Sequence, residues 1–479
     1  MKSSWIEDNR ALKDSGFELL TLAALRPDSI KAVWLDPSTG QQIQLGLDVA
    51  EKRFPSLATT LPETAWDERE IHDLLGWTPQ GHPDLRPLIR TPRWPESFLP
   101  LDSSFPKPRW LDVEPDLPAI KVEGDGITYM KVGPTHAGII ESGHFVFSII
   151  GENVLHLDAH LFQNHRGIES MVEGKRIDET ARILSRVCAA DTVSNQANFA
   201  QAVEKVAGFD PTPALVNQRI VLLEAERVLS HLNDLAQIPA GAGFQVAHQR
   251  ALAIKEQWQR SLEMLFGHRF LFDAILPGSA RHAPPEQVIS CVSELHNLWS
   301  AWRRSTCSHR GFINRMQGVG ITPPDRVIRM GAQGVAARAS GKPFDARQSH
   351  PWYEELFSKA ALKSSGDVNA RFQVRLDEVE DSIRIIKNAA EKLGGMPPHE
   401  PRFKVPDDLD GQVTTFNESP HGLNVHAAVF KTGRIGRYHI RSASFRNWPL
   451  LAQTVAGNGV ADFPLINKSF ELCYSCTDR

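Results

Sequence analysis

The stretch Gln218–Leu235, with the sequence QRIVLLEAERVLSHLNDL, sets the character of the chain. Its apolar residues recur at helical spacing and form one face of a long amphipathic helix. They are Ile220, Leu223, Val228, Leu232 and Leu235. Ala370–Leu393 has the same pattern, and helical periodicity prevails from about Leu161 onward. These features predict a large, mainly helical core in the second part of the chain.

Strand patterns flank the helical region on both sides. Upstream, short β-branched or alternating runs predict strands at Ile127–Val132, His144–Ile150 and Val154–Leu157. Downstream, we expect the chain from Gln412 to the closing Cys473–Arg479 to return to strands and loops. The helical core is therefore expected to carry peripheral strands.

The first hundred residues have a mixed pattern. Two apolar runs, Ile30–Leu35 and Gln41–Gly46, lie on either side of a turn at Pro37–Gly40 and predict a hairpin. A helix is expected at Ala65–Leu75, followed by a loop at Gly81–Pro87. This region is predicted to be an α/β domain.

A proline-rich stretch marks the domain boundary. Proline fixes φ and removes a backbone donor, so this stretch is expected to be an extended, stiff connector. Its prolines are Pro92, Pro95, Pro100, Pro106, Pro108, Pro115 and Pro118. We therefore predict an α+β chain with an α/β domain at 1–110, a proline-rich linker at 111–122 and a mainly α-helical domain at 123–479.

Composition excludes several classes of protein. The 479 residues include 53 Lys and Arg against 57 Asp and Glu, a formal charge of −4, which argues against a nucleic-acid binder. No run approaches the roughly 18 apolar residues of a membrane helix. The N-terminus lacks the apolar core of a secretory signal, and we find no NAD-binding motif. We expect a cytoplasmic protein that is able to sit on membrane partners.

The five cysteines are too few for a disulfide scaffold. Cys473-Tyr-Ser-Cys476 places two sulfurs one helical turn apart, where both can face one ligand, although a redox pair or two unconnected thiols fit the same spacing. Cys188-Ala-Ala-Asp191 has an aspartate where a second such cysteine would stand. Asp191 is a harder ligand that cannot bridge two metals as a thiolate does. The remaining two, Cys291 and Cys307, are expected to be structural.

Further polar motifs fall at glycine-rich turns. Gly133-Pro-Thr-His136 and Glu141-Ser-Gly-His-Phe145 lie between two predicted strands, Arg338-Ala-Ser-Gly341 follows a glycine-rich segment, and Glu418-Ser-Pro-His-Gly422 occupies a turn. Each motif alone is also compatible with a solvated loop. The occurrence of all these motifs in one chain indicates a functional site more strongly than any single motif does.

Together these motifs resemble a known family over nearly the whole length. The chain resembles the large subunit of group 4, membrane-bound, energy-converting NiFe hydrogenases, and equally the quinone-site large subunit of respiratory complex I. Two motifs resemble the small peripheral-arm subunit of complex I: Glu68–Gly76 (EREIHDLLG) and Gly81–Arg86 (GHPDLR). Those that resemble the large subunit are Gly133–His136, Glu141–Phe145, His165–Glu169, Glu224–Leu232, Arg338–Gly341, Gly366–Arg371, Glu418–Pro420 and Cys473–Arg479. The closing cysteine pair is similar to the hydrogenase branch.

The resemblance implies an oxidoreductase subunit and a metal site. In the family four cysteines hold nickel, and two of them bridge to an iron; Cys188, Cys473 and Cys476 match, whereas the fourth position is Asp191. A nickel–iron centre would thus have an incomplete ligand set. The family also loses a C-terminal tail after a basic residue three positions past the last cysteine. Arg479 has that position, and the sequence leaves open whether a tail was removed.

The same resemblance implies roles for three further residues and a set of partners. Glu141 would move protons, a role that requires burial to raise its pKa. Arg338 would supply positive charge to the cavity, and His136 would contact quinone in the complex I reading. The expected partners are a small iron–sulfur subunit and antiporter-like membrane subunits, which would hold the chain peripherally at the cytoplasmic face.

Three hypotheses follow from the resemblance. The first is a hydrogenase-like redox subunit with an altered or empty nickel site, coupled to ion-pumping membrane subunits. The second is a working hydrogenase in which Asp191 is a terminal ligand, since nickel accepts oxygen. The third is a metal-free quinone-site or coupling subunit. A zinc site formed by the three thiolates and Asp191 is a minor alternative.

Overall fold

The computed structural model describes residues 2–26, 28–49, 51–95, 97–102, 111–113, 118–136, 140–397, 399 and 403–479. The predicted linker is thus described only at 111–113 and 118–122, and Pro106, Pro108 and Pro115 lie outside the described residues. The mixed α+β class is confirmed, since helices dominate and the strands form several small sheets. Among the described residues, no helix is long and apolar enough to cross a membrane.

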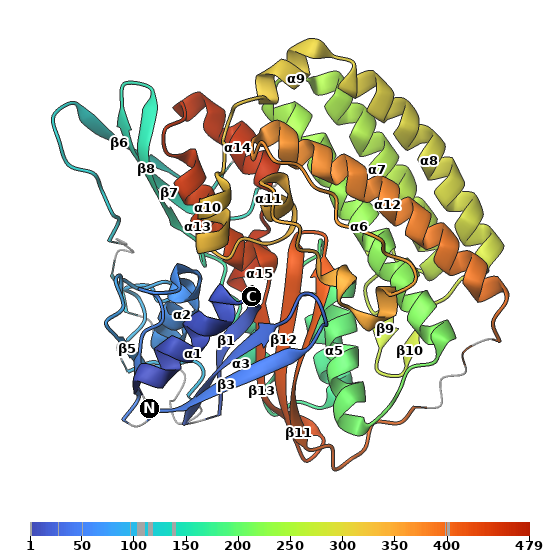
Figure 1. Ribbon diagram of the computed structural model, residues 1–479, viewed down its shortest axis with the longest axis horizontal. Helices are drawn as coiled ribbons and strands as arrows, with labels where there is room; N and C mark the ends of the chain where they lie inside the picture. The colour runs from blue at the N-terminus through green and yellow to red at the C-terminus, as the bar shows by residue number, and fades with distance from the viewer. Residues whose placement is uncertain are drawn as a thin grey trace.

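The N-terminal region is an antiparallel sheet flanked by helices (Figure 1). The sheet has the order β1 (Glu18–Arg26), β2 (Ser29–Leu35) and β3 (Gln42–Asp48), so the predicted hairpin is confirmed. The predicted helix is α2 (Ala65–Leu75), which ends at Gly76 in the left-handed conformation. Helix α1 (Lys2–Asp14) and the short parallel pair β4 (Arg53–Pro55) and β5 (Thr78–Gln80) complete the region. Three tryptophans, Trp5, Trp34 and Trp77, are buried in its core.

Four long helices pack side by side in the second region (Figure 1). They are α6 (Pro213–Gly241), α7 (Gln245–Phe266), α8 (Pro285–Cys307) and α12 (Val368–Gly394). The predicted stretches lie within α6 and α12, and these two helices contact each other along their length. The side chains of Thr212 and Asp367 cap their N-termini. Helix α6 is buried on its polar as well as its apolar face.

Shorter elements connect these parts. They are α3 (Ile168–Val172), α4 (Ile177–Leu184), α9 (Arg310–Met316), α10 (Pro324–Arg329), α11 (Gly334–Ala339), β9 (Ile275–Leu276) and β10 (Ser279–Ala280). Single turns of 3-10 helix occur at Pro62–Thr64, Ala346–Gln348, Pro351–Tyr353 and Val460–Asp462.

An antiparallel sheet joins the two regions. It consists of β11 (Gly411–Ser419), β12 (Gly422–Lys431) and β13 (Arg434–Arg441), and β12 is buried along nearly its whole length. Alternate residues of a strand face opposite sides. Leu423, Val425 and Ala427 pack on the N-terminal sheet, whereas Ala428 and Phe430 pack with residues of α5 (Thr192–Ala207). This sheet is internal because both of its faces are covered, one by the N-terminal sheet and the other by α5, so the expected peripheral position does not hold for it.

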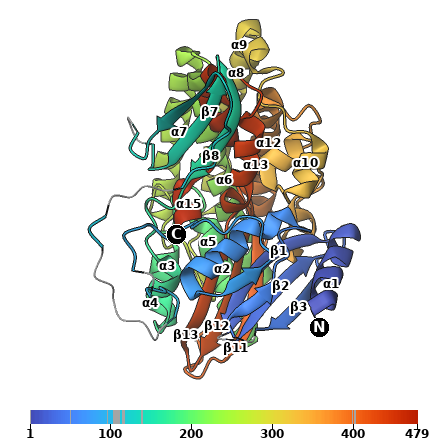
Figure 2. The ribbon, with the colours of Figure 1, turned by 90° about the vertical axis from the view of Figure 1, so that its left-hand side faces the viewer.

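The peripheral strands are β6 (Ile127–Val132), β7 (His144–Ile150) and β8 (Asn153–His160), at the positions that the sequence predicts (Figure 2). The prediction of only strands and loops after residue 412 is wrong for the last part. There the chain forms α13 (Ala443–Val455), α14 (Phe463–Phe470) and α15 (Tyr474–Asp478). Pro449 inside α13 and the shortness of the other two helices conceal them in the sequence. Helix α15 carries the closing cysteine motif.

Candidate functional site

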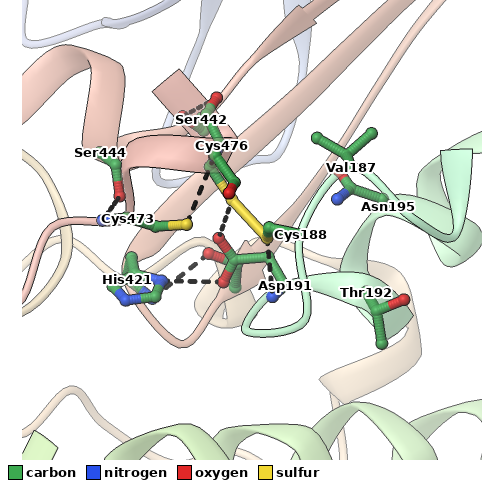
Figure 3. Close-up of a disulfide and its surroundings, with 12 residues drawn as sticks. Val187, Cys188, Asp191, Thr192, Asn195, His421, Ser442, Ser444, Cys473 and Cys476 are labelled. Atoms are coloured by element: carbon green, nitrogen blue, oxygen red, sulfur yellow. Dashed lines mark hydrogen bonds and ion pairs between the residues drawn. A yellow bond between two sulfur atoms is a disulfide. The ribbon is translucent and has the colours of Figure 1, made fainter. Parts of the chain in front are cut away.

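Three segments that are far apart in the sequence converge near the C-terminus (Figure 3). The turn before α5 carries Cys188 and Asp191, and the start of α15 carries Cys473 and Cys476. The three sulfur atoms lie within 4.8 Å of one another. The structure joins Cys188 and Cys476 as a disulfide and leaves Cys473 free. The predicted grouping of these four residues is therefore present, and we call it the cysteine-rich site.

Backbone donors arrange both halves of the cysteine-rich site in the same way. The backbone N–H of Asp191 donates to Sγ of Cys188 at 3.3 Å, and that of Cys476 donates to Sγ of Cys473 at 3.3 Å. Each pair of side chains is thus held within one turn, facing a common centre. The i, i+3 spacing of Cys188 and Asp191, and of Cys473 and Cys476, allows the two side chains of each pair to face the same side.

The third segment is the turn between β11 and β12, which brings His421 to Asp191. Nδ1 of His421 lies 2.9 Å from Oδ1 of Asp191, and Oδ2 of Asp191 lies 3.0 Å from Sγ of Cys476. All three residues are buried. Burial lowers the pKa of His421, but the carboxylate of Asp191 outweighs it and raises this pKa to about 9. His421 therefore forms an ion pair with Asp191. Sequence reasoning missed this residue.

The donor set decides which metal centre fits. Burial, followed by the negative charges of Asp191 and Glu141, raises the pKa of Cys473 well above its ordinary value, so without a metal Cys473 is a neutral thiol and a metal ion would have to displace its proton. Three sulfurs and one carboxylate suit a single zinc or nickel ion once the cysteines are reduced. They do not fit a four-thiolate nickel–iron centre, because Asp191 supplies a carboxylate oxygen in place of the fourth, potentially bridging sulfur.

Glu141 and His136 lie between β6 and β7, in the described segments 140–143 and 133–136. Glu141 accepts hydrogen bonds from the backbone N–H of Ser475, at 2.9 Å, and from the Ser475 hydroxyl. A ring nitrogen of His136 lies 2.7 Å from the carbonyl of Gly143 and connects these two segments. A side chain at Gly133 would meet the same carbonyl. Glu141 reaches the cysteine motif but is exposed in this chain, so the burial that its proposed role requires is not found here.

Arg338 lies in a separate region rather than at the cysteines. Its guanidinium contacts Glu378 at 2.8 Å, Glu418 at 2.6 Å and Asp345 at 3.4 Å. We call this region the buried charge cluster, and each of its side chains is at most 1% exposed. Its members are Glu224, Arg227 and His231 of α6, Glu378 of α12, Arg338, Asp345 and Arg347 of the segment 338–347, and Glu418 of β11.

A third group, Glu70, Glu169 and His439, also brings three side chains with ligand atoms within 4.8 Å. Arg479 lies against it, with ion pairs of 2.5 Å to Glu70 and 2.8 Å to Glu169. Arg441 adds a contact of 3.3 Å to Glu70. The guanidinium groups satisfy these carboxylates, so the group is an ionic contact between the N-terminal region and the C-terminus.

Two family models match separate parts of the chain. Residues 3–109 match the family described as respiratory-chain NADH dehydrogenase, 30 Kd subunit, and residues 243–479 match the 49 Kd subunit. Hydrogenase-4 component G of Escherichia coli (strain K12) is 30% identical over 90% of this chain and 77% of its own length. Formate hydrogenlyase subunit 5 of the same organism is 29% identical over 91% and 79%.

A solved structure extends the comparison to three dimensions. A chain of the membrane-bound sulfane sulfur reductase, an archaeal respiratory membrane complex, is 25% identical with a TM-score of 0.69, covering 74% of this chain and 99% of that chain. The matches define an oxidoreductase component. The chain belongs to the family that unites the large subunits of group 4 energy-converting hydrogenases with the 49 Kd subunit of complex I, and it carries a 30 Kd-type region at its N-terminal end.

Proposed function

We propose that this chain is the large subunit of a membrane-associated respiratory oxidoreductase complex in which the nickel–iron site has been altered. One observation carries the proposal: Asp191, which the family resemblance assigns to the fourth ligand position, is held by His421 at 2.9 Å. A buried carboxylate paired with an imidazolium is a stable arrangement by itself. His421 therefore stabilises the buried carboxylate of Asp191 without the need for a nickel–iron centre.

The names of the relatives support the proposal that this chain is part of a membrane-associated complex. Their names include hydrogenase and formate hydrogenlyase components, and the solved relative belongs to a respiratory membrane complex. We infer that this chain exchanges electrons with a small iron–sulfur subunit and is held at the cytoplasmic face by antiporter-like, ion-pumping membrane subunits. The division into domains at 1–110 and 123–479, joined by the linker at 111–122, is part of the same proposal.

The residues of the site then have separate tasks. Cys188, Cys473 and Cys476 supply sulfur donors, and Asp191 supplies one oxygen. Glu141 holds Ser475 between the two cysteines of α15 and can pass a proton at its carboxylate oxygen once a partner subunit covers the loop. Arg338 acts on the site only through the turn that carries Glu418 and His421.

Metal analysis of the purified, reduced complex tests the proposal, together with an assay of hydrogen evolution. We expect less than stoichiometric nickel and no hydrogen turnover. The variant Asp191→Cys restores the fourth thiolate, so nickel retention should rise several-fold. The matched control Cys307→Ser changes a free cysteine outside the site, on α8, and should leave metal content unchanged.

Other results would favour the other hypotheses. Stoichiometric nickel with hydrogen turnover in the unaltered complex would contradict the proposal and establish Asp191 as a working ligand. Zinc at one ion per chain, seen by X-ray absorption, would identify the three-thiolate zinc site. Activity that depends on quinone and is lost in His136→Ala, with no metal bound, would support the quinone-site reading.

A further inference from the structure

A cavity lies between the N-terminal region and the second region, and the proposed function does not use it. Its volume is about 430 Å³, which is within the range of small-molecule sites. Residues of α2, β8, α10 and α13, which are labelled in Figure 2, line it together with the segment 84–88. The described residues that line it include no member of the cysteine-rich site or of the buried charge cluster. We call it the arginine cavity, after Arg69, Arg86 and Arg326.

Two of these three arginines are already paired with carboxylates. Arg86 contacts Asp84 at 2.9 Å and Asp158 at 2.8 Å. Arg69 lies 3.6 Å from Asp84 and donates to the backbone carbonyls of residues 86 and 87. Burial alone would raise the pKa of both carboxyls, but their hydrogen bonds, with His160 and Arg86, outweigh it and lower both pKa values. These two guanidiniums and two carboxylates therefore balance one another.

Arg326 of α10 has a different setting. One nitrogen of its guanidinium donates to the backbone carbonyl of Gln453 at 2.9 Å, which holds the side chain against α13. The guanidinium has no carboxylate partner among the described residues. The described residues that line the cavity thus carry three guanidiniums against two carboxylates. The surplus is one positive charge when the histidines of the cavity are neutral.

Part of the remaining wall is apolar. Pro449, Ala452 and Ala456 follow one another at helical spacing along α13 and just past its end, so they share one side of the helix. Their small side chains leave space in front of that side. From β8 and the residue that follows it, Leu157 and Leu161 also line the cavity, and both are buried. The cavity therefore offers contacts to an apolar body as well as to an anion.

The wall also contains polar groups that lack partners. Trp448 lines the cavity and is fully buried, and its indole N–H has no hydrogen-bond partner among the described residues. An indole N–H only donates, so what it lacks is an acceptor. His156 likewise has a buried ring nitrogen without a partner among the described residues, and a ring nitrogen donates in one of its two tautomers. The wall is therefore short of acceptors, as its surplus of arginine also indicates.

We propose that the arginine cavity binds an organic monoanion with an apolar body: a carboxylate pairs with Arg326, and an aliphatic chain or a ring lies against α13 and β8. A guanidinium holds a carboxylate through two parallel hydrogen bonds. The single surplus charge fits a carboxylate better than a phosphate monoester, which carries about −1.5 to −2 at pH 7. Binding requires neither a metal nor electrons at the cysteine-rich site, so this inference is independent of the proposed function.

Calorimetric titration of the purified full-length chain tests the class of ligand. Octanoate has both the carboxylate and an apolar body, 1-octanol has the body alone, and acetate has the charge alone. We expect saturable binding of octanoate at one site per chain, with the other two weaker by about tenfold or more. 3-Phenylpropanoate repeats the test with an aromatic body. Absence of binding by both larger carboxylates at millimolar concentration, or equal binding of 1-octanol and octanoate, would overturn the proposal.

Substitutions on α10 test the role of Arg326. Arg326→Gln keeps a donor toward the carbonyl of Gln453 but removes the charge, so the affinity for octanoate should fall by about tenfold or more. Arg326→Lys keeps the charge without the paired hydrogen bonds and should give an intermediate affinity. Arg329→Gln is the matched control, because Arg329 is exposed on the same helix and does not line the cavity. Equal losses in Arg326→Gln and Arg329→Gln would mean that general attraction to a basic helix holds the carboxylate, and the proposal would be wrong.

A further variant fills the cavity without changing its charge. Ala452→Phe places a ring in the space beside α13 and should abolish octanoate binding, while circular dichroism and the melting temperature report whether the chain remains folded. Photolabelling locates the site on the unaltered chain. A diazirine analogue of octanoate should attach to peptides that contain residues 154–161 or 445–456, and excess octanoate should suppress the label. Label confined to other parts of the chain would overturn the proposal even if octanoate binds.

Discussion

The contact between the N-terminal region and the C-terminus differs from the buried charge cluster in one respect, although both consist of buried arginines and carboxylates. At this domain contact, Asp67, Glu70 and Glu169 face Arg441, Arg446 and Arg479, so the charges are equal when His439, 3.2 Å from Glu169, is neutral. In the cluster, four carboxylates face three arginines. The domain contact needs no proton to be neutral and acts as a permanent ionic clamp. The cluster has one carboxylate more than it has arginines, so its buried charges are not balanced by ion pairs alone.

The largest loss of stability is expected from a substitution at the centre of the buried charge cluster. Arg338→Met leaves Glu378, Glu418 and Asp345 without their shared cation. Removing one partner of a buried ionic group typically lowers stability by about 3–5 kcal/mol. Urea unfolding of the full chain should show a loss in this range at pH 7, and a smaller loss at pH 5, where protons can neutralise the excess carboxylates.

A smaller loss of stability is expected from a substitution at the balanced domain contact. Arg441→Met removes contacts of 2.8 Å to Asp67 and 3.3 Å to Glu70, yet Arg446 still pairs with Asp67 and Arg479 with Glu70. We expect a loss of about 2–3 kcal/mol by urea unfolding, toward the low end for buried pairs. A loss equal to that of Arg338→Met would mean that charge balance does not distinguish the two regions.

The same comparison shows what the sequence could and could not predict. Helices α6 and α12 were predictable because their apolar residues repeat at 3.6-residue spacing, and Cys473 and Cys476 because the spacing of the motif is local. Strand β1 was not, since the continuous apolar run ELLTLAALR is as typical of a buried helix. His421 was missed because its partner, Asp191, lies 230 residues away.

The buried charge cluster was hidden for a different reason. Glu224, Arg227 and His231 recur at helical spacing on α6, and such residues ordinarily form the solvated face of an amphipathic helix. Only the packing of α12 and β11 against that face buries it. A single sequence shows the polarity of a face but not what covers it. Net charge is also summed over the whole chain, so a local imbalance of one charge leaves no trace in it.

The smallest change in stability is expected from a substitution of Glu68, which neighbours the balanced domain contact but has no guanidinium partner among the described residues. Its oxygens accept from the Ser56 hydroxyl at 2.5 Å and the backbone N–H of Leu57 at 2.6 Å. Burial outweighs these donors and raises the pKa of Glu68 to about 7. The folded chain therefore binds a proton that the unfolded chain has lost between its ordinary pKa and pH 7, so stability falls as pH rises through this window.

Glu68→Gln removes that titration and should stabilise the chain at pH 8 by about 1–3 kcal/mol relative to its effect at pH 5. The neighbouring Glu70 is the matched control, because Arg479 and then Arg441 overcome burial and lower its pKa. A lowered pKa contributes stability above the ordinary carboxyl pKa that is lost in acid, so Glu70→Gln should destabilise more at pH 8 than at pH 3. Urea unfolding across this pH range measures both variants. Shifts of the same sign in the two would show that the arginines of the domain contact do not set the charge of Glu70.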